Sequence, residues 1–213
     1  MILILALFIG IAIGRLLGGR IRGLSDLRLR YIWLPVVVFT VQAALLKTPL
    51  RELGWALLLT PVIVVATYVV LVGWLLLNRR SSGVPLVLAG AILNLVVIAA
   101  NGGYMPVTPE AIERAGLGDR VLIQEGRTYV AGSKDVVLEA DETVLWPLSD
   151  VVVIPEGIPF STIFSVGDLL IAVGVGRLAY AAVRRGAEEE IEVRTGAAGE
   201  SGRWTIRKEE VDA

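Results

Sequence analysis

The chain has 213 residues, of which 55% are hydrophobic, with a mean hydropathy of +0.71 and a formal net charge of −1. This hydropathy is higher than that of ordinary soluble domains and favours a membrane protein. The chain has no cysteine and no histidine, which excludes disulfides, zinc sites built on these residues, cysteine nucleophiles and Ser-His-Asp catalysis.

Five apolar segments follow one another along the chain and predict an all-α membrane protein with five transmembrane helices. They are residues 1–17, 31–46, 53–77, 84–100 and 158–183. A helix of about 20 residues crosses a hydrocarbon core of roughly 30 Å, and about 17 to 25 residues are tolerated. The third and fifth segments meet this length, while the second lies near the short limit.

The first segment is either a cleaved signal peptide or an uncleaved helix. It has no basic residue before the apolar run and no small-residue cleavage pattern after it, whereas Arg15, Arg20 and Arg22 follow it. Signal peptides carry their positive charge at the start. This order therefore favours an uncleaved helix whose amino terminus lies outside.

Basic residues are concentrated in alternate connections, which predicts the orientation of the helices. Arg20, Arg22, Arg28 and Arg30 lie between the first two helices, Arg79 and Arg80 between the third and fourth, and Arg184 and Arg185 after the fifth. The loop 102–160 has four basic and ten acidic residues. Cytoplasmic loops carry the excess of arginine. We therefore expect a multi-pass protein of the bacterial cytoplasmic membrane with its amino terminus and this loop outside and its carboxyl terminus in the cytoplasm.

We expect residues 1–183, with a partly ordered outer loop at 102–160, to form one transmembrane domain. In the loop, Thr108-Pro109 predicts a helix start, and Gly116 or Gly118 ends that helix. Residues 121–145 show no clean hydrophobic period, so the sequence does not distinguish short strands from short helices there. The apolar residues 146–160 are expected along the outer membrane surface. Residues 184–213 form a charged cytoplasmic tail, predicted to be disordered from Gly186.

Three stretches of the chain resemble a known family. They are Gly14-Arg15-Leu16-Leu17-Gly18-Gly19-Arg20 with Leu27-Arg28-Leu29-Arg30 and Gln42, then Asn101-Gly102-Gly103-Tyr104-Met105-Pro106-Val107, and then Phe164-Ser165-Val166-Gly167-Asp168. They are similar to a family of uncharacterised bacterial multi-pass membrane proteins, domain-of-unknown-function family 5317. The resemblance runs from Met1 to about Val183 and implies a polytopic membrane protein without an assigned activity.

Asp168 is the acidic residue within the fifth apolar segment and the first candidate for function. A carboxylate at the bilayer centre costs about 2.5–3.5 kcal/mol, so such a residue normally faces the helix bundle or a water-filled cavity. One interpretation is a carboxylate that binds a ligand or an ion or carries a proton. The other is a helix-start aspartate favoured by the amides of the first turn. Gln42 and Lys47 of the second helix are candidates to partner it.

The fourth helix carries further polar candidates. Asn94 and Asn101 lie with Gly90 on one stripe, either as hydrogen-bonded glue between helices or as the lining of a cavity. The run Asn101-Gly102-Gly103-Tyr104 ends this helix as a cap or as a backbone approach to a ligand. Its tyrosine suits the aromatic belt at the membrane interface.

Gly10, Gly14 and Gly18 are spaced by four in the first helix. Small residues let helices approach closely in lipid, where no hydrophobic force draws them together. The spacing predicts helix packing, either within one chain or between the two copies of a homodimer.

The sequence favours a non-enzymatic envelope component that binds a partner or lipid at its outer face. A small-solute or ion transporter or channel that uses Asp168 is the alternative. An intramembrane enzyme is a remote alternative: Val166-Gly167-Asp168 is similar to the Gly-Asp motif of intramembrane aspartyl proteases, which need a second carboxylate, and Asp150 is the nearby candidate. The basic residues are few and explained by topology, so no nucleic acid is expected, nor any cofactor or metal.

Overall fold

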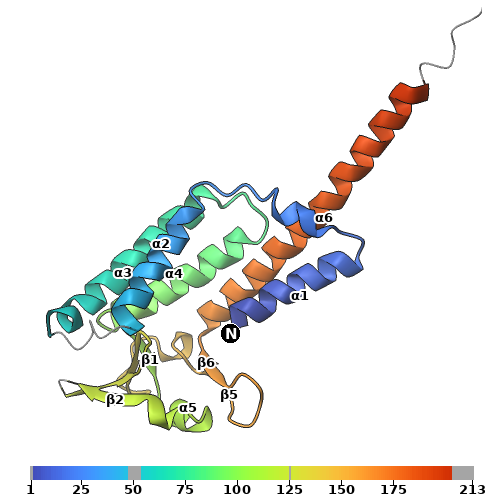
Figure 1. The fold of residues 1–213 in the computed structure, drawn as a ribbon. Helices are drawn as coiled ribbons and strands as arrows, with labels where there is room; N and C mark the ends of the chain where they lie inside the picture. The colour runs from blue at the N-terminus through green and yellow to red at the C-terminus, as the bar shows by residue number, and fades with distance from the viewer. Residues whose placement is uncertain (1, 48–53, 125, 203–213) are drawn as a thin grey trace, which may run out of the picture.

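The computed structural model describes residues 2–47, 54–124 and 126–202 (Figure 1). The long helices run alongside one another; they are α1 (Ile2–Leu16), α2 (Trp33–Lys47), α3 (Gly54–Leu77), α4 (Val84–Ala100) and α6 (Val166–Gly202). Each corresponds to one of the predicted apolar segments, and α1 to α4 begin and end close to the predicted limits. A helix pairs its backbone N–H and C=O groups internally. This suits an apolar segment, because its side chains cannot form hydrogen bonds with the backbone.

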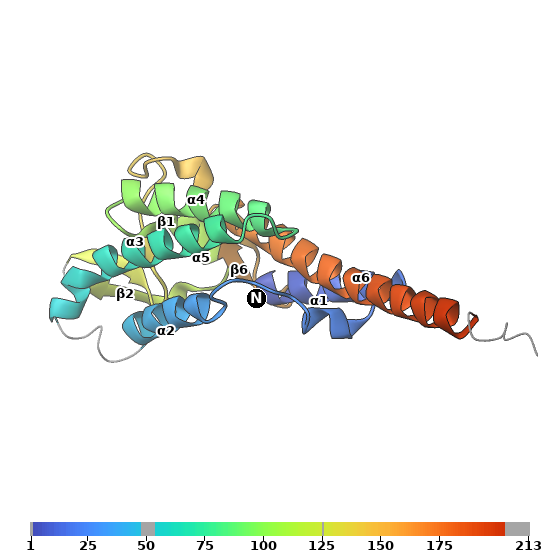
Figure 2. The same cartoon turned by 90° about the horizontal axis from the view of Figure 1, so that it is seen from above.

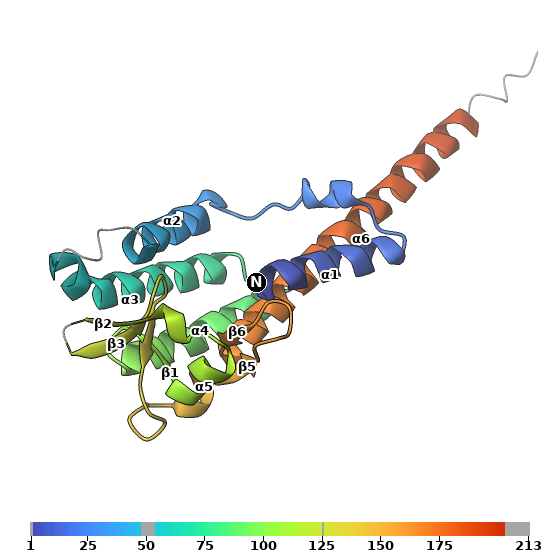
Figure 3. The same cartoon turned by 60° about the horizontal axis from the view of Figure 1, so that its bottom comes forward.

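The five long helices form a staggered row. α2 packs on α3, α3 on α4, α4 on α6, and α6 on α1, so that α2 and α1 lie at the two ends of the row (Figures 2 and 3). The backbone of Gly90, midway along α4, packs on Gly167, and Gly83, just before α4, packs on Gly174. α6 therefore begins beside the middle of α4, and the chain that joins the two helices occupies the end of the row.

This joining chain folds as a small unit of strands and helices, named here the sheet domain (residues 102–165), which Figure 1 shows at one end of the helices. Its main sheet has the strand order β1-β4-β3-β2, with β1 parallel to β4 and the other pairs antiparallel. A second sheet pairs β5 with β6 in antiparallel fashion. The strands are β1 (Met105–Val107), β2 (Val121–Gln124), β3 (Arg127–Val130), β4 (Asp135–Val137), β5 (Val152–Ile154) and β6 (Thr162–Phe164). The prediction of an all-α protein is therefore wrong for this region.

The sheet domain folds because it has an apolar core of its own. Val107, Ala111, Ile112 and Val130 are buried together, and residues 121–145, for which strands and helices were both open, supply β2, β3 and β4. Short helices complete the domain and the connections; they are α5 (Pro109–Arg114), η3 (Gly118–Arg120), η4 (Trp146–Leu148) and, before α2, η1 (Ile21–Leu24).

The predicted start of α5 is confirmed. The Thr108 side chain accepts a hydrogen bond from the Ala111 N–H at 3.3 Å, as an N-cap does. The helix ends at Arg114, and Gly116 follows with a φ of +64°. Glycine adopts this left-handed conformation without the steric cost of a Cβ.

Both limits of α6 differ from the prediction. The helix begins at Val166 rather than near residue 158, because β6 occupies the preceding residues. It continues to Gly202, where a disordered tail from Gly186 was expected, and Figure 1 shows it projecting beyond the other helices. Glutamate occupies four of the six residues 187–192, and it favours a helix. Residues 203–213 lie outside the described residues.

Length and composition support two of the five predicted spans. In the described chain, Leu58–Leu77 of α3 and Val166–Gly186 of α6 are long and apolar enough to cross a membrane. α1, α2 and α4 are apolar as well, but they have 15, 15 and 17 residues.

Candidate functional site

α6 begins with two reciprocal hydrogen bonds between Ser165 and Asp168. Ser165 Oγ accepts from the Asp168 N–H at 3.0 Å, and Asp168 Oδ2 accepts from the Ser165 N–H at 3.3 Å. This is a capping box, in which the two side chains satisfy backbone donors of the first turn. The negative charge of Asp168 also lies at the positive end of the helix dipole. The structure therefore places Asp168 as a helix-start aspartate.

Asn94 joins this capping box to α4. Its Nδ2 donates to Asp168 Oδ1 at 2.8 Å, and its Oδ1 accepts from Ser165 Oγ at 2.9 Å. Gly167 leaves room for the amide, because a Cβ there would lie 2.0 Å from Asn94 Oδ1. The side chain of Tyr68 of α3 also interacts with Asn94. In this Asn94 network (Tyr68, Asn94, Ser165 and Asp168), Asn94 and Ser165 are fully buried, and both carboxylate oxygens of Asp168 are occupied.

Three charged side chains of the sheet domain form a second group, the Lys134 cluster (Lys134, Asp135 and Asp150). Lys134 Nζ lies 3.3 Å from Asp135 Oδ1, and both side chains are mostly buried. Asp150 lies deeper, since it is 4% exposed and its N–H donates to the Pro106 carbonyl at 3.1 Å. Its Oδ1 is buried and has no hydrogen-bond partner among the described residues.

The pKa values of this cluster are shifted by burial and by the neighbouring charges. Burial raises the pKa of the Asp150 carboxyl to about 8; Lys134 opposes the increase, while Asp135 and Asp168 add to it. Burial lowers the pKa of the Lys134 amine, but the carboxylates of Asp135 and Asp150 outweigh burial and hold this pKa well above its ordinary value. Lys134 therefore stays charged at neutral pH, whereas Asp150 can take up or release a proton there.

The Lys134 cluster and the Asn94 network lie within electrostatic range of each other. The charges of Lys134 and Asp150 act on Tyr68, and Asp168 acts on both Lys134 and Asp150. No hydrogen bond joins Asp150 to Asp168 in the described structure. The two carboxyl groups therefore do not share a proton as the pair of an aspartyl protease does. The described residues also contain no group of three or more acidic side chains placed to hold a metal ion. The arrangement can hold a proton and can fasten the sheet domain to the helices.

Asn101 joins the carboxyl end of α4 to the sheet domain and is separate from the Asn94 network. Its Nδ2 donates to the Val144 carbonyl at 2.9 Å, and its Oδ1 accepts from the Val144 N–H at 3.0 Å. The Nδ2 group also donates to the Val97 carbonyl at 2.8 Å. Asn101 thus pairs with Val144 as a neighbouring strand would.

Gly102 and Gly103, the two residues after Asn101, are each required by the local structure. Gly102 and Gly103 have φ values of +70° and +90°, and the Gly103 N–H donates to the Ile98 carbonyl at 2.8 Å, as in a Schellman cap. A Cβ on Gly103 would lie 2.3 Å from Pro61 Cβ, so this glycine also permits close packing on α3. Both glycines are explained by these contacts without a ligand.

Of three further predicted residues, Tyr104 and Gln42 have partners other than Asp168. Tyr104 is buried in the sheet domain, with its ring centroid 5.4 Å from that of Tyr129, and does not lie in an interfacial belt. Gln42 Nε2 donates to Thr67 Oγ1 at 2.7 Å and so joins α2 to α3. Lys47 is the last residue of α2, and its side chain lies outside the described residues.

Comparison with known proteins yields one match. A family model with the description "Family of unknown function (DUF5317)" matches residues 26–180, which is well over half of the chain. The chain belongs to this family. No curated protein and no solved structure matches it. The predicted resemblance is confirmed, although the matched region begins after the stretch from Gly14 to Arg20. The DUF5317 region contains the Asn94 network and the Lys134 cluster, and the family description gives no function to either.

α1 precedes the DUF5317 region and packs on α6 through Gly10 and Gly14, two of the three glycines predicted to pack helices. A Cβ on Gly10 would lie 2.1 Å from the Gly176 carbonyl oxygen, and one on Gly14 would lie 2.9 Å from Val183 Cβ. Gly18 differs, because it follows α1 with a φ of +84° and meets only Arg184, at 4.0 Å. Gly10 and Gly14 therefore pack two helices of the same chain, and Gly18 forms a turn.

Four members of the two groups are absent from the predicted site, namely Tyr68, Lys134, Asp135 and Ser165. For Ser165 the sequence does hold a signal, because Ser-x-x-Asp before an apolar run is the pattern of a capping box. Lys134 and Asp135 lie in a charged loop, where exposed side chains are the usual outcome. In this DUF5317 member, only the fold brings them against the helices.

Proposed function

We propose that this protein is a multi-pass membrane protein in which α1, α2, α3, α4 and α6 all cross the bilayer. Large apolar side chains are exposed on every one of these helices, for example Phe8, Phe39, Leu58, Val96 and Val173. Soluble proteins rarely expose apolar patches of this extent, whereas lipid tails solvate them. Local thinning of the bilayer accommodates helices that are somewhat short.

The placement of charge supports the predicted orientation. Arginines are concentrated in the connection between α1 and α2, in the turn between α3 and α4, and midway along α6; they include Arg28, Arg30, Arg79, Arg80, Arg184 and Arg185. Figure 1 shows these segments at the end of the helices away from the sheet domain. The loop 102–160, at the opposite end, has ten acidic and four basic residues. Because arginine-rich connections stay in the cytoplasm, the sheet domain then faces the outside of the cell membrane.

We further propose that the protein is a non-enzymatic envelope component that binds a partner through the sheet domain. The observation that carries this proposal is that the hydrogen bonds of the Asn94 network engage Asp168 within the fold. Both oxygens of Asp168 are engaged by Asn94 and Ser165, so this acid fastens the start of α6 to α4. Together with the paired bonds between Asn101 and Val144, the network supports a domain held rigidly on the helices and available for recognition.

The open edge of the main sheet is the surface to which we assign the partner. β2 is the last strand in the order β1-β4-β3-β2. Its residues Leu122 and Ile123 are 50% and 80% exposed. An edge strand presents backbone donors and acceptors that can pair with an extended segment of another chain.

Site-specific photocrosslinking in intact cells tests this assignment. A photoreactive residue at Ile123 of the full chain is expected to link to one envelope protein of defined mass. The same residue at Asp141, which is exposed elsewhere on the sheet domain, is expected to give no such product. The same product from both positions, or no product from Ile123, would contradict partner binding at β2.

A pathway for an ion or small solute is the second candidate, and the partnerless Oδ1 of Asp150 favours it. This atom is buried beside Lys134 and within electrostatic range of Asp168. Liposomes that contain the full chain would then show proton or cation flux that is lost in Asp168→Asn and Asp150→Asn but kept in Asp141→Asn. Liposomes without flux would exclude this function and leave the partner-binding proposal in place.

A further inference from the structure

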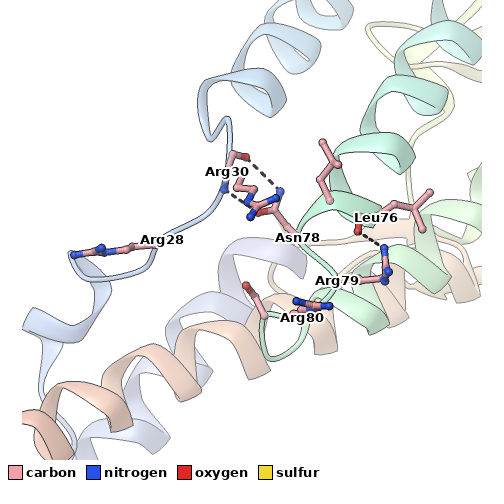
Figure 4. A pocket seen from close by; sticks show the side chains of 8 residues that line it. Arg28, Arg30, Leu76, Asn78, Arg79 and Arg80 are labelled. Atoms are coloured by element: carbon pink, nitrogen blue, oxygen red, sulfur yellow. Dashed lines mark hydrogen bonds between the residues drawn. The ribbon is translucent and has the colours of Figure 1, made fainter.

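Four arginines from two distant segments line one pocket at the end of the helices away from the sheet domain (Figure 4). Arg28 and Arg30 come from the connection before α2, and Arg79 and Arg80 come from the turn after α3. The pocket, named here the arginine pocket, has a volume of about 410 Å³ and is also lined by Asn78. Arginines that serve only to orient a membrane protein have no need to line a common pocket.

Asn78 holds the two segments of the arginine pocket together. The Arg30 N–H donates to Asn78 Oδ1 at 2.8 Å, and Asn78 Nδ2 donates to the Arg30 carbonyl at 3.3 Å. Trp74 Nε1 donates to the same carbonyl at 2.7 Å. In the described structure, none of the four arginines forms an ion pair with a carboxylate. The pocket therefore presents positive charge that its own residues leave uncompensated.

The arginine pocket continues into a second basic pocket and then into an apolar groove. Arg79, Arg80 and Ser81 also line the second pocket, which has a volume of about 410 Å³ and includes Arg177 of α6. Arg177 and Leu86 in turn line a groove of about 620 Å³ between α1 and α6. Apart from Arg177, apolar residues dominate this groove; they include Ile9, Ile13 and Val173.

The part of the groove between Arg177 and the start of α6 is about as long as one leaflet of a bilayer. Along the α1 side, the groove extends from Ile2 to Leu17, roughly 22 Å at about 1.5 Å per residue. On α6, the part from Leu169 to Arg177 covers roughly 12 Å. The hydrocarbon core of a bilayer is roughly 30 Å thick, so one acyl chain covers about half of it. Arg177, at one end of this part of the groove, complements the phosphate of a lipid, and the apolar lining complements its acyl chain.

We propose that an anionic phospholipid of the cytoplasmic leaflet binds here, with its phosphate among Arg79, Arg80 and Arg177 and one acyl chain in the groove. Guanidinium groups bind phosphate oxygens through two parallel hydrogen bonds, and basic pockets between membrane helices bind such head groups. The site rests on the membrane placement and orientation proposed above. Its arginines lie at the other end of the molecule from the partner surface.

Native mass spectrometry of the full chain in detergent tests the charged part of the site. Phosphatidylglycerol is expected to bind more tightly than phosphatidylcholine of the same acyl chains. The double variant Arg80→Gln with Arg177→Gln is expected to weaken phosphatidylglycerol binding about tenfold or more. The control Arg22→Gln with Arg185→Gln removes the same charge outside both pockets and the groove. An equal loss in the control, or no loss in the first variant, would overturn the site.

The acyl-chain part needs its own variant. Val173→Trp fills the groove without changing charge and is expected to weaken phosphatidylglycerol binding, while inorganic phosphate at the lipid's concentration does not compete. Unchanged binding in this variant, or competition by phosphate, would overturn the groove. Alkaline extraction of membranes separates this inference from the proposal above. A chain that stays in the membrane without a lipid preference refutes the site alone, whereas an extracted chain refutes the membrane placement.

Discussion

At the scale of single residues, Asp168 shows how a local pattern and a distant contact combine. The Ser165 capping box is readable in the sequence as Ser-x-x-Asp and explains why an acid stands at the start of an apolar helix. The bond from Asn94 to Asp168 joins residues 74 positions apart. Asn94 and Asp168 were both expected in one polar group, and the structure brings them together, whereas Asn101, Tyr104 and Gln42 have other partners.

The Asn94 network predicts an energetic coupling between its members. Asn94→Leu removes a hydrogen-bond partner from the half-buried Asp168 carboxylate and from the buried Ser165 hydroxyl, so we expect it to lower the free energy of unfolding by about 1–3 kcal/mol. Asp168→Asn in the same background should then cost less than it does alone, with a coupling of about 0.5–3 kcal/mol. Thermal or denaturant unfolding of the full chain in detergent measures this cycle. Strictly additive losses would show that the network carries no coupling.

Asp150 predicts a pH dependence of stability. Its pKa is raised to about 8 in the folded protein, whereas a carboxyl in an unfolded chain titrates near 3.9. Between about pH 4 and pH 8 the unfolded chain has lost a proton that the folded protein still binds, so this group makes the folded state progressively less stable as the pH rises. No further loss is expected above both values.

Asp150→Asn removes that titration. We expect its unfolding temperature to vary less across about pH 4 to pH 8 than that of the unmodified chain, and to exceed it at about pH 8. Scanning calorimetry in detergent at several pH values measures the difference. Asp141→Asn, at an exposed position, is the matched control and should keep the pH dependence of the unmodified chain. Identical profiles for both variants would contradict a buried Asp150 with a raised pKa.

At the scale of elements, the helices were the most predictable part and the strands the least. A long apolar run determines a helix in lipid regardless of its neighbours, because no other open structure satisfies its backbone. The strands β2, β3 and β4 have three or four residues each, too short to show a period. A signal does exist in the tight turn between β2 and β3, where Gly126 has a φ of +75°.

The contact between α1 and α6 predicts opposite effects for two glycine substitutions. A Cβ on Gly10 would lie 2.1 Å from the Gly176 oxygen, whereas one on Gly73 of α3 meets nothing within 4 Å. Alanine is the better helix former by about 1 kcal/mol, so Gly73→Ala should be neutral or stabilising. Gly10→Ala should lower the free energy of unfolding by about 1–3 kcal/mol, as overpacking does. Thermal unfolding in detergent compares the two, and equal stability would disprove the close contact.

At the scale of the whole molecule, the arrangement separates an acidic domain from an arginine-bearing end, with the helices between them. The row of helices places the sheet domain at the end where α4 finishes and α6 begins. The two basic pockets lie toward the other end, and the groove runs along α1 and α6 as far as Leu169, near the start of α6. The proposed partner surface and the arginines of the proposed lipid site are thus on opposite sides of the membrane in the orientation given above.

This orientation predicts the accessibility of single cysteines. The chain has no cysteine of its own, so each engineered one reports alone. Asp141→Cys in the sheet domain should react with a membrane-impermeant thiol reagent in intact cells. Asp26→Cys, exposed in the connection between α1 and α2, should react only after the membrane is permeabilised. The reverse pattern would overturn the orientation and, with it, both proposed surfaces.

The sequence by itself determined the apolar helices, the cap of α5 and the separation of charge, because each depends on a contiguous run or on neighbouring positions. The tertiary structure alone decided that Asn94 meets Asp168, that Lys134 and Asp150 are buried beside them, and that Arg28 and Arg79 share a pocket. The reason is physical. Hydropathy and capping act over a few neighbouring residues, whereas a polar contact between distant residues depends on how all the helices and strands pack together.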